Sequence, residues 1–254
     1  MKIAAVQHDI VWEDPKANFE RLGPKVAQAA ADGARLVVLA EMYSTGFSMA
    51  SDRVAEAPDG PSVGFLVDQA ASHGVWVCGS VPVRDPSKAE LPFNRFVLTG
   101  PDGEAAFYDK IHPFSYGGEH EHYAAGAERL TVTVEGVRIT PFVCYDLRFS
   151  DEFWTLASDT DCYVVVANWP APRRAHWSAL LVARAIENQA YVVGVNRVGT
   201  GGGIDYQGDS VVIDPFGVEV ASASEGEEAV LYADIDLARL EEVRSRYPFL
   251  GDRR

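Results

Sequence analysis

Short apolar runs that are typical of buried strands alternate with amphipathic stretches along most of this chain. Strands that alternate with helices are typical of α/β proteins, because a helix carries the chain back to the start of the next strand. The pattern therefore predicts an α/β fold. Strands are expected at residues 35–40, 75–82, 93–99, 162–168, 191–197, 207–213 and 218–222, and helices at residues 15–32, 62–73, 150–158 and 175–190.

The chain carries no internal sign of a domain boundary. Asp14 and Gly33 frame the helix at 15–32 as its N-cap and its terminating residue. No stretch rich in Pro, Gly and Ser divides the rest of the chain. With 254 residues, of which 47% are hydrophobic, the chain can bury a large core. We therefore expect a single domain over residues 1–254.

Charge and hydropathy argue against several classes of protein. The formal net charge is −15, and basic residues do not cluster among aromatic ones, so a nucleic-acid partner is not expected. No apolar run is long enough to span a membrane, and the first residues read as a strand rather than a signal peptide. The three cysteines fit a reducing, cytoplasmic location. No cofactor or metal is expected, since the alternating Glu and His of residues 119–122 lack a distant further ligand.

One cysteine lies where a nucleophile is often found. Cys144 follows the apolar run at 139–143 and precedes a polar segment. A strand would fix the position of the sulfur, and the turn after it would expose the thiol beside free backbone N–H groups. Cys78 and Cys162 lie within apolar runs and are interpreted as packing residues. Because a lone cysteine is more often a core residue than a nucleophile, Cys144 needs partners.

Two charged residues upstream could be those partners. Glu41 follows the apolar run at 35–40, and Lys110 follows residues 105–109. A carboxylate, an ammonium and a thiol, each after a strand, could serve as general base, oxyanion stabiliser and nucleophile. Taken singly, Glu41 and Lys110 could equally be solvated surface charges.

These segments resemble the catalytic segments of the nitrilase superfamily of carbon–nitrogen hydrolases. The likeness lies in residues 39–42, 108–112 and 143–149, which occur in the family's order and at its usual separations. The Cys-Tyr-Asp-Leu-Arg-Phe stretch is similar to that of the ω-amidase-like branch. Further similar blocks are residues 167–170, 184–189, 208–210 and 214–217.

The resemblance implies a fold and an activity. The fold would be a four-layer α-β-β-α sandwich of two mixed sheets, and relatives commonly form homodimers. The activity would be hydrolysis of the terminal amide of a small ω-amido acid, similar to 2-oxoglutaramate, to acid and ammonia through a thioester. A nitrilase, or a hydrolase of N-carbamoyl compounds or other linear amides, would use the same triad. A non-enzymatic metabolite-binding module is the alternative from a different class.

For an amide substrate, the expected roles follow from the chemistry. Glu41 would take the proton from Cys144 and later pass it to the departing ammonia. Lys110 and the backbone N–H of Tyr145 would hold the oxyanion. A small amide is therefore the expected partner of the site.

Two further pairs of charged residues have expected roles. The resemblance favours Glu119, rather than Glu121, as a second carboxylate close to the lysine. Asp146 and Arg148 are expected to pair with each other and to hold the turn that carries the nucleophile.

Another set of residues is expected to form the substrate pocket. An acidic protein that binds an anion needs a fixed cation nearby, and Arg173 or Arg174 could clamp a substrate carboxylate bidentately. Each residue of the set could instead be an ordinary core or surface residue. The candidates besides Tyr145 are Asn168, Trp169, Arg173, Arg174, Phe114 and Tyr43.

Overall fold

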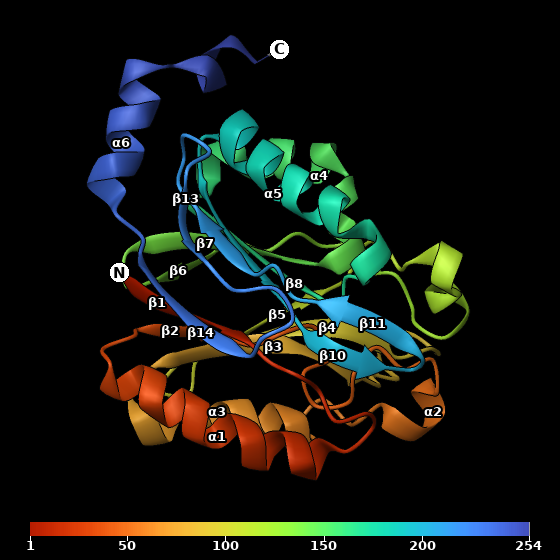
Figure 1. Cartoon of the computed structure of the whole chain (residues 1–254). Helices are drawn as coiled ribbons and strands as arrows, with labels where there is room; N and C mark the ends of the chain where they lie inside the picture. Colours follow the sequence, from red (N-terminus) through yellow and green to blue (C-terminus); the bar gives the residue numbers. More distant parts are fainter. Residues whose placement is uncertain (254) are drawn as a thin grey trace.

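Two six-stranded sheets form the centre of the computed structural model, which describes residues 1–253 (Figure 1). The first sheet consists of β1 (Lys2–Gln7), β2 (Leu36–Val38), β3 (Trp76–Val83), β4 (Phe93–Thr99), β5 (Ala105–Asp109) and β14 (Ala229–Asp234). The second consists of β6 (Val132–Val134), β7 (Val137–Val143), β8 (Cys162–Ala167), β9 (Tyr191–Asn196), β12 (Val211–Ile213) and β13 (Glu219–Ser222).

The two sheets share one plan. Their strand orders are β14-β1-β2-β3-β4-β5 and β13-β12-β9-β8-β7-β6. In the first sheet β1, β2 and β3 run parallel, and in the second β7, β8 and β9 do so. Antiparallel strands flank both parallel triplets. Both sheets are therefore mixed.

Helices cover the outer face of each sheet (Figure 1). Helices α1 (Pro15–Ala31) and α3 (Pro61–His73) pack on the first sheet, and α4 (Ser150–Leu156) and α5 (Arg174–Asn188) lie over the second. The predicted four-layer α-β-β-α sandwich is thus confirmed. The remaining helices are α2 (Ser51–Val54) and α6 (Leu237–Arg246), and no helix in the described part of the chain is long and apolar enough to cross a bilayer.

The apolar strands are buried on both faces, which explains their continuous hydrophobic runs. In β1, Ile3 and Ala5 belong to the core that includes the inner faces of both sheets, whereas Ala4 and Val6 pack toward α1 and α3. This alternation follows from the two-residue period of a strand. Helix α1 begins where expected, because the Asp14 side chain accepts a hydrogen bond from the Ala17 N–H at 3.0 Å.

The predicted strand at 207–213 is wrong in its extent. It is divided between β11 (Ile204–Gln207) and β12, and residues 208–210 between them are not strand. Gly208 and Asp209 both have positive φ, which breaks the extended backbone. Strand β11 pairs instead with β10 (Val198–Gly201), and this hairpin was not expected from the sequence.

Candidate active site

Cys144 lies where β7 ends and the 3₁₀ helix η3 (Cys144–Arg148) begins. Its φ is +47°, in the left-handed region where any side chain strains the backbone. Cys144 is 8% exposed and lines a pocket. Because the first N–H groups of a helix have no intrahelical acceptor, the Tyr145 N–H next to the thiol is available to an anion.

The buried carboxylate of Asp146 holds this turn in place. It accepts hydrogen bonds from the Val143 N–H at 3.0 Å, the Tyr108 hydroxyl at 2.8 Å and the His112 N–H at 2.9 Å. Among the described residues 1–253, Asp146 pairs with His112 and not with Arg148, so the predicted pair between Asp146 and Arg148 is wrong. All these donors come from β7 and from the segment around Lys110, so Asp146 ties the nucleophile turn to the lysine segment.

Glu41, Lys110 and Glu119 form a fully buried charge cluster. Glu41 follows β2, Lys110 follows β5, and Glu119 begins the 3₁₀ helix η2 (Glu119–Glu121). The Lys110 ammonium lies 2.8 Å from Glu119 and 3.2 Å from Glu41. The Asn94 amide donates to Glu41 at 2.8 Å and to Glu119 at 3.1 Å. Lys110 and the Asn94 amide therefore each bridge the two carboxylates.

The second half of the chain contributes to the same cluster. The backbone N–H of Asn168, just after β8, donates to Glu41 at 2.7 Å, and the Asn168 side-chain amide donates to the Glu41 carbonyl at 2.6 Å. These bonds fix the orientation of the Glu41 carboxylate. The cluster is therefore assembled across both sheets.

Burial and neighbouring charges set the protonation states. Burial acts to lower the pKa of Lys110, but Glu119 and Glu41 outweigh it and the pKa is raised. Burial raises the pKa of Glu119, against the opposing effect of Lys110. Burial and the charge of Glu41 raise the pKa of Cys144, although Lys110 lowers it. At neutral pH the lysine is charged and the resting nucleophile is a neutral thiol, so a base is needed when it attacks.

The structure places Glu119, and not Glu121, beside the lysine. Glu119 is fully buried, whereas the Glu121 side chain is 70% exposed. Among residues 1–253, no group of His, Cys, Asp and Glu side chains is arranged to hold a metal ion. The roles of the four charged or nucleophilic residues stay predictions, but their proximity is a property of the fold.

The pocket at Cys144 has a volume of about 310 Å³, and six of its sixteen lining residues are aromatic. Arg148 and Arg173 are its charged lining residues, and no acidic side chain of the described chain lines it. The Arg148 guanidinium lies 4.9 Å from the Trp169 ring centroid and that of Arg173 lies 5.3 Å from the Phe114 ring centroid. Its lining comprises Trp12, Phe47, Met49, Phe114, Gly117, Cys144, Tyr145, Arg148, Asn168, Trp169, Pro170, Arg173, Gly201, Gly202, Ile204 and Tyr206.

Most of the predicted pocket residues lie in this lining, but two do not. Arg174 points elsewhere, because its guanidinium pairs with Asp209 at 2.6 Å and with Glu225 at 2.5 Å. Tyr43 is buried between the first sheet and its helices, where its hydroxyl donates to the Ser62 carbonyl at 2.5 Å. The predictions that Arg174 and Tyr43 contact the substrate are therefore wrong.

Sequence reasoning missed several lining residues. Arg148 was expected to be structural, but it lies on the same short helix η3 as the nucleophile and lines the pocket. Trp12, Ile204 and Tyr206 lie far from the motifs in sequence. Only the packing of the β10–β11 hairpin against the end of β1 brings them to the pocket.

The chain is similar over its length to proteins of known family. A family model described as carbon–nitrogen hydrolase matches residues 2–245. The chain is 42% identical to the omega-amidase YafV of Escherichia coli K12, covering 99% of this chain and 96% of that protein. It is 33% identical to the 2-oxoglutaramate amidase of Bacillus subtilis, covering 98% and 96%. A carbon–nitrogen hydrolase superfamily protein of Xanthomonas campestris, solved with an arsenic adduct in its active site, has a TM-score of 0.94 and 41% identity, covering 100% and 97%.

Proposed function

Since the chain belongs to the carbon–nitrogen hydrolase family, we propose that it is an ω-amidase, which cleaves the terminal amide of a small ω-amido acid similar to 2-oxoglutaramate. The E. coli and B. subtilis relatives carry the names of such enzymes and match almost the whole chain. The products would be the dicarboxylic acid and ammonia.

The observation that carries the proposal is the charge distribution of the pocket. A thiol beside a buried carboxylate and lysine supplies the chemistry, while Arg148 and Arg173 are the charged side chains that line the cavity. Among residues 1–253, neither arginine forms an ion pair with a carboxylate. Their charges are therefore available to a substrate carboxylate, even though the chain as a whole has a net charge of −15.

In the proposed reaction Glu41 acts as both base and acid, while Lys110 stabilises the negative charge. Glu41 takes the proton of Cys144 as the sulfur attacks the amide carbon. Lys110 and the Tyr145 N–H stabilise the oxyanion, and collapse of the intermediate expels the amine with the proton from Glu41. Glu41 then deprotonates a water that attacks the thioester, and Glu41 returns this proton to the leaving sulfur. The acid and the free thiol result.

Glu119 has a supporting role in this scheme. Its 2.8 Å contact with Lys110 keeps the ammonium charged and oriented. Without that contact, the lysine would pair more closely with Glu41 and compete with its function as a base. This is the physical reason for a second buried carboxylate at a site that needs one base.

A substrate panel with detection of released ammonia tests the proposal. We expect 2-oxoglutaramate to be hydrolysed far faster than pentanamide, a neutral amide of equal chain length, and faster than the matching nitrile and N-carbamoyl compounds. Alkylation of the thiol should abolish all turnover. Faster turnover of the nitrile or of the N-carbamoyl compound would contradict the ω-amidase proposal and leave only the family activity.

Arginine variants test the carboxylate contacts directly. A charge-assisted hydrogen bond is typically worth about 1.5–3 kcal/mol, so Arg148→Met or Arg173→Met should raise KM for 2-oxoglutaramate by about tenfold or more. Pentanamide should be nearly unaffected. Arg174→Met is the matched control, because Arg174 follows Arg173 but pairs with Asp209 and Glu225. An equal effect of all three variants would contradict these contacts.

We also infer a homodimer and a cytoplasmic location. Ile186, Phe216 and Phe249 are exposed. Phe216 and Phe249 both pack on Tyr247, and Ile186 lies against Gly217, next to Phe216, so that they form an apolar surface. Light scattering should show a dimer that Phe216→Glu weakens. The three cysteines are free thiols, which a reducing compartment preserves. Fractionation of cells that produce the protein tests the location.

A further inference from the structure

Tyr206 of β11 is a buried tyrosine whose hydroxyl has no hydrogen-bond partner in the described part of the chain. It is 3% exposed and lines the pocket of Cys144. Among residues 1–253, no side chain or backbone group forms a hydrogen bond with this hydroxyl. Its oxygen is not among the unpaired polar atoms that are sealed off from solvent, so it is accessible from the pocket. Buried tyrosine hydroxyls usually have a partner. Those of Tyr43, Tyr108, Tyr123 and Tyr163 all do.

Burial and nearby charges set the protonation state of Tyr206. Burial raises the pKa of this phenol, and Arg197 opposes that effect. Glu41 and Cys144 raise the pKa further, while Arg173 lowers it. The phenol is therefore neutral at working pH and can donate a hydrogen bond into the pocket that Cys144 and Arg173 also line.

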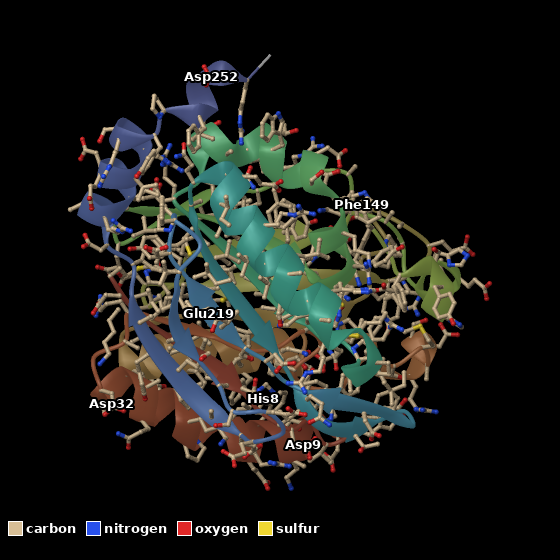
Figure 2. All side chains as sticks on the ribbon, turned by 45° about the horizontal axis from the view of Figure 1, so that its top comes forward. His8, Asp9, Asp32, Phe149, Glu219 and Asp252 are labelled. Carbon is tan, nitrogen blue, oxygen red and sulfur yellow. The ribbon has the colours of Figure 1, made fainter. Side chains whose placement is uncertain are left out.

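A buried arginine behind the ring fixes its position. The Arg197 guanidinium is fully buried and lies 4.7 Å from the Tyr206 ring centroid. It donates to Asp9 at 2.7 Å and to the Ile10 carbonyl at 3.1 Å, next to the end of β1. Figure 2 shows Asp9 beside the β10–β11 hairpin. A Cβ on Gly201 would lie 2.4 Å from Arg197, so a glycine at that position lets the hairpin pack this closely.

We propose that Tyr206 is a specificity-determining residue, whose hydroxyl donates a hydrogen bond to the 2-oxo group of the substrate. The assignment rests on the proposed ω-amidase function. A cation suits the carboxylate end, and Arg148 and Arg173 provide it. A neutral donor suits the ketone oxygen, which is also neutral. The ketone carbon is bonded to the carboxylate carbon and lies between it and the scissile amide. A substrate without the ketone would leave the buried hydroxyl unpaired, so the site discriminates against it.

The experiment compares 2-oxoglutaramate with glutaramate, which has a CH₂ group in place of the ketone. Tyr206→Phe should lower kcat/KM for 2-oxoglutaramate by about tenfold, the upper range for one neutral hydrogen bond. The value for glutaramate should change less than about twofold. Tyr232→Phe is the control, because that hydroxyl bonds Asp32 on the outer surface. It should leave both values unchanged.

Each other outcome overturns the assignment. An equal loss in kcat with both substrates would place the hydroxyl at the reacting carbonyl. An equal rise in KM with both, but not with pentanamide, would place it at the carboxylate. If Tyr206→Phe fails to fold, the wild-type enzyme still decides, because it must prefer 2-oxoglutaramate over glutaramate by about tenfold or more. A wild-type enzyme that hydrolyses glutaramate as well as 2-oxoglutaramate refutes the role of Tyr206 but not the proposed ω-amidase function. One that hydrolyses neither refutes the proposed function.

Discussion

The strained backbone at Cys144 marks it as a different kind of cysteine from its two buried counterparts. Cys144→Ser should lower kcat by about a thousandfold or more, because Glu41 cannot activate an alcohol as it does a thiol. The fold should persist, as judged by circular dichroism. Cys162→Ser makes the same one-atom change inside β8, and it should alter stability by only about 1 kcal/mol and leave kcat nearly unchanged. Near-normal turnover of Cys144→Ser would disprove its role as nucleophile.

The two glutamates of η2 differ in environment and should differ in effect. Glu119→Gln removes one of the carboxylates on Lys110, so the lysine should pair with Glu41 and kcat should fall by about 10²–10³. Glu121→Gln, at a side chain that is 70% exposed, should change kcat less than about twofold. Steady-state kinetics on the two purified variants measures both effects. The reverse order would transfer the second carboxylate to Glu121.

At the scale of single residues, strand ends were the informative positions in the sequence. Glu41, Lys110 and Cys144 each follow a strand, and the structure brings them together. Side-chain direction was not predictable in the same way. Arg173 and Arg174 are neighbours, yet only Arg173 lines the pocket, because the ion pair with Asp209 turns Arg174 away. That pair joins positions 35 residues apart, and no local pattern indicates it.

At the scale of elements, the turn formed by η3 depends on one carboxylate. Asp146→Asn replaces one carboxylate oxygen by an NH₂ group, which cannot accept a hydrogen bond. Depending on which oxygen is replaced, either the Val143 N–H and the Tyr108 hydroxyl or the His112 N–H loses its acceptor. A buried donor left unpaired typically costs about 1–3 kcal/mol, so the melting temperature should fall. The turn should also loosen, so that kcat drops more than tenfold and the rate of Cys144 alkylation changes. Unchanged kinetics together with an unchanged alkylation rate would contradict this role of Asp146.

The elements themselves were largely predictable, since most strands and helices carry continuous apolar runs or capping residues. The β10–β11 hairpin was not predicted, because its glycine-rich turn at 201–203 reads as a loop. The position of the hairpin depends on the Arg197 and Trp12 side chains, which pack against Gly201. Such a tertiary contact has no counterpart in local sequence. The residue proposed to recognise the 2-oxo group lies on this same hairpin.

At the scale of the whole molecule, the two similar halves meet at the site. Glu41, Lys110 and Glu119 come from the first half, whereas Cys144 and Asn168 come from the second. The Asn168 N–H that bonds Glu41 crosses between them. The duplicated plan could be read from the order of elements, but the face-to-face packing that assembles the site was expected only from the family resemblance.

His8 lies at a second junction between the halves, at the end of β1 (Figure 2). Its ring is buried, and its carbonyl accepts a hydrogen bond from the Val198 N–H at 3.1 Å. Burial lowers the pKa of His8 from 6.5 to about 4, and the nearby Arg197 adds to this effect. The folded state thus favours the neutral ring. The stability contributed by this preference is fully present above pH 6.5 and declines as the pH falls toward about 4.

This difference predicts how the stability of the whole molecule depends on pH. Each pH unit below 6.5 should cost about 1.4 kcal/mol until the pH approaches the folded-state pKa. Between pH 6.5 and 5, the wild-type protein should therefore lose about 2 kcal/mol more unfolding free energy than His8→Gln, which cannot titrate at this position. Urea unfolding at the two pH values measures the difference. His120→Gln is the control, since that side chain is 52% exposed and its loss should leave the pH dependence unchanged. If His8→Gln and the wild type lost stability in parallel, His8 would be protonated as readily in the fold as in the unfolded chain, and the acid sensitivity of the junction would have to come from other groups.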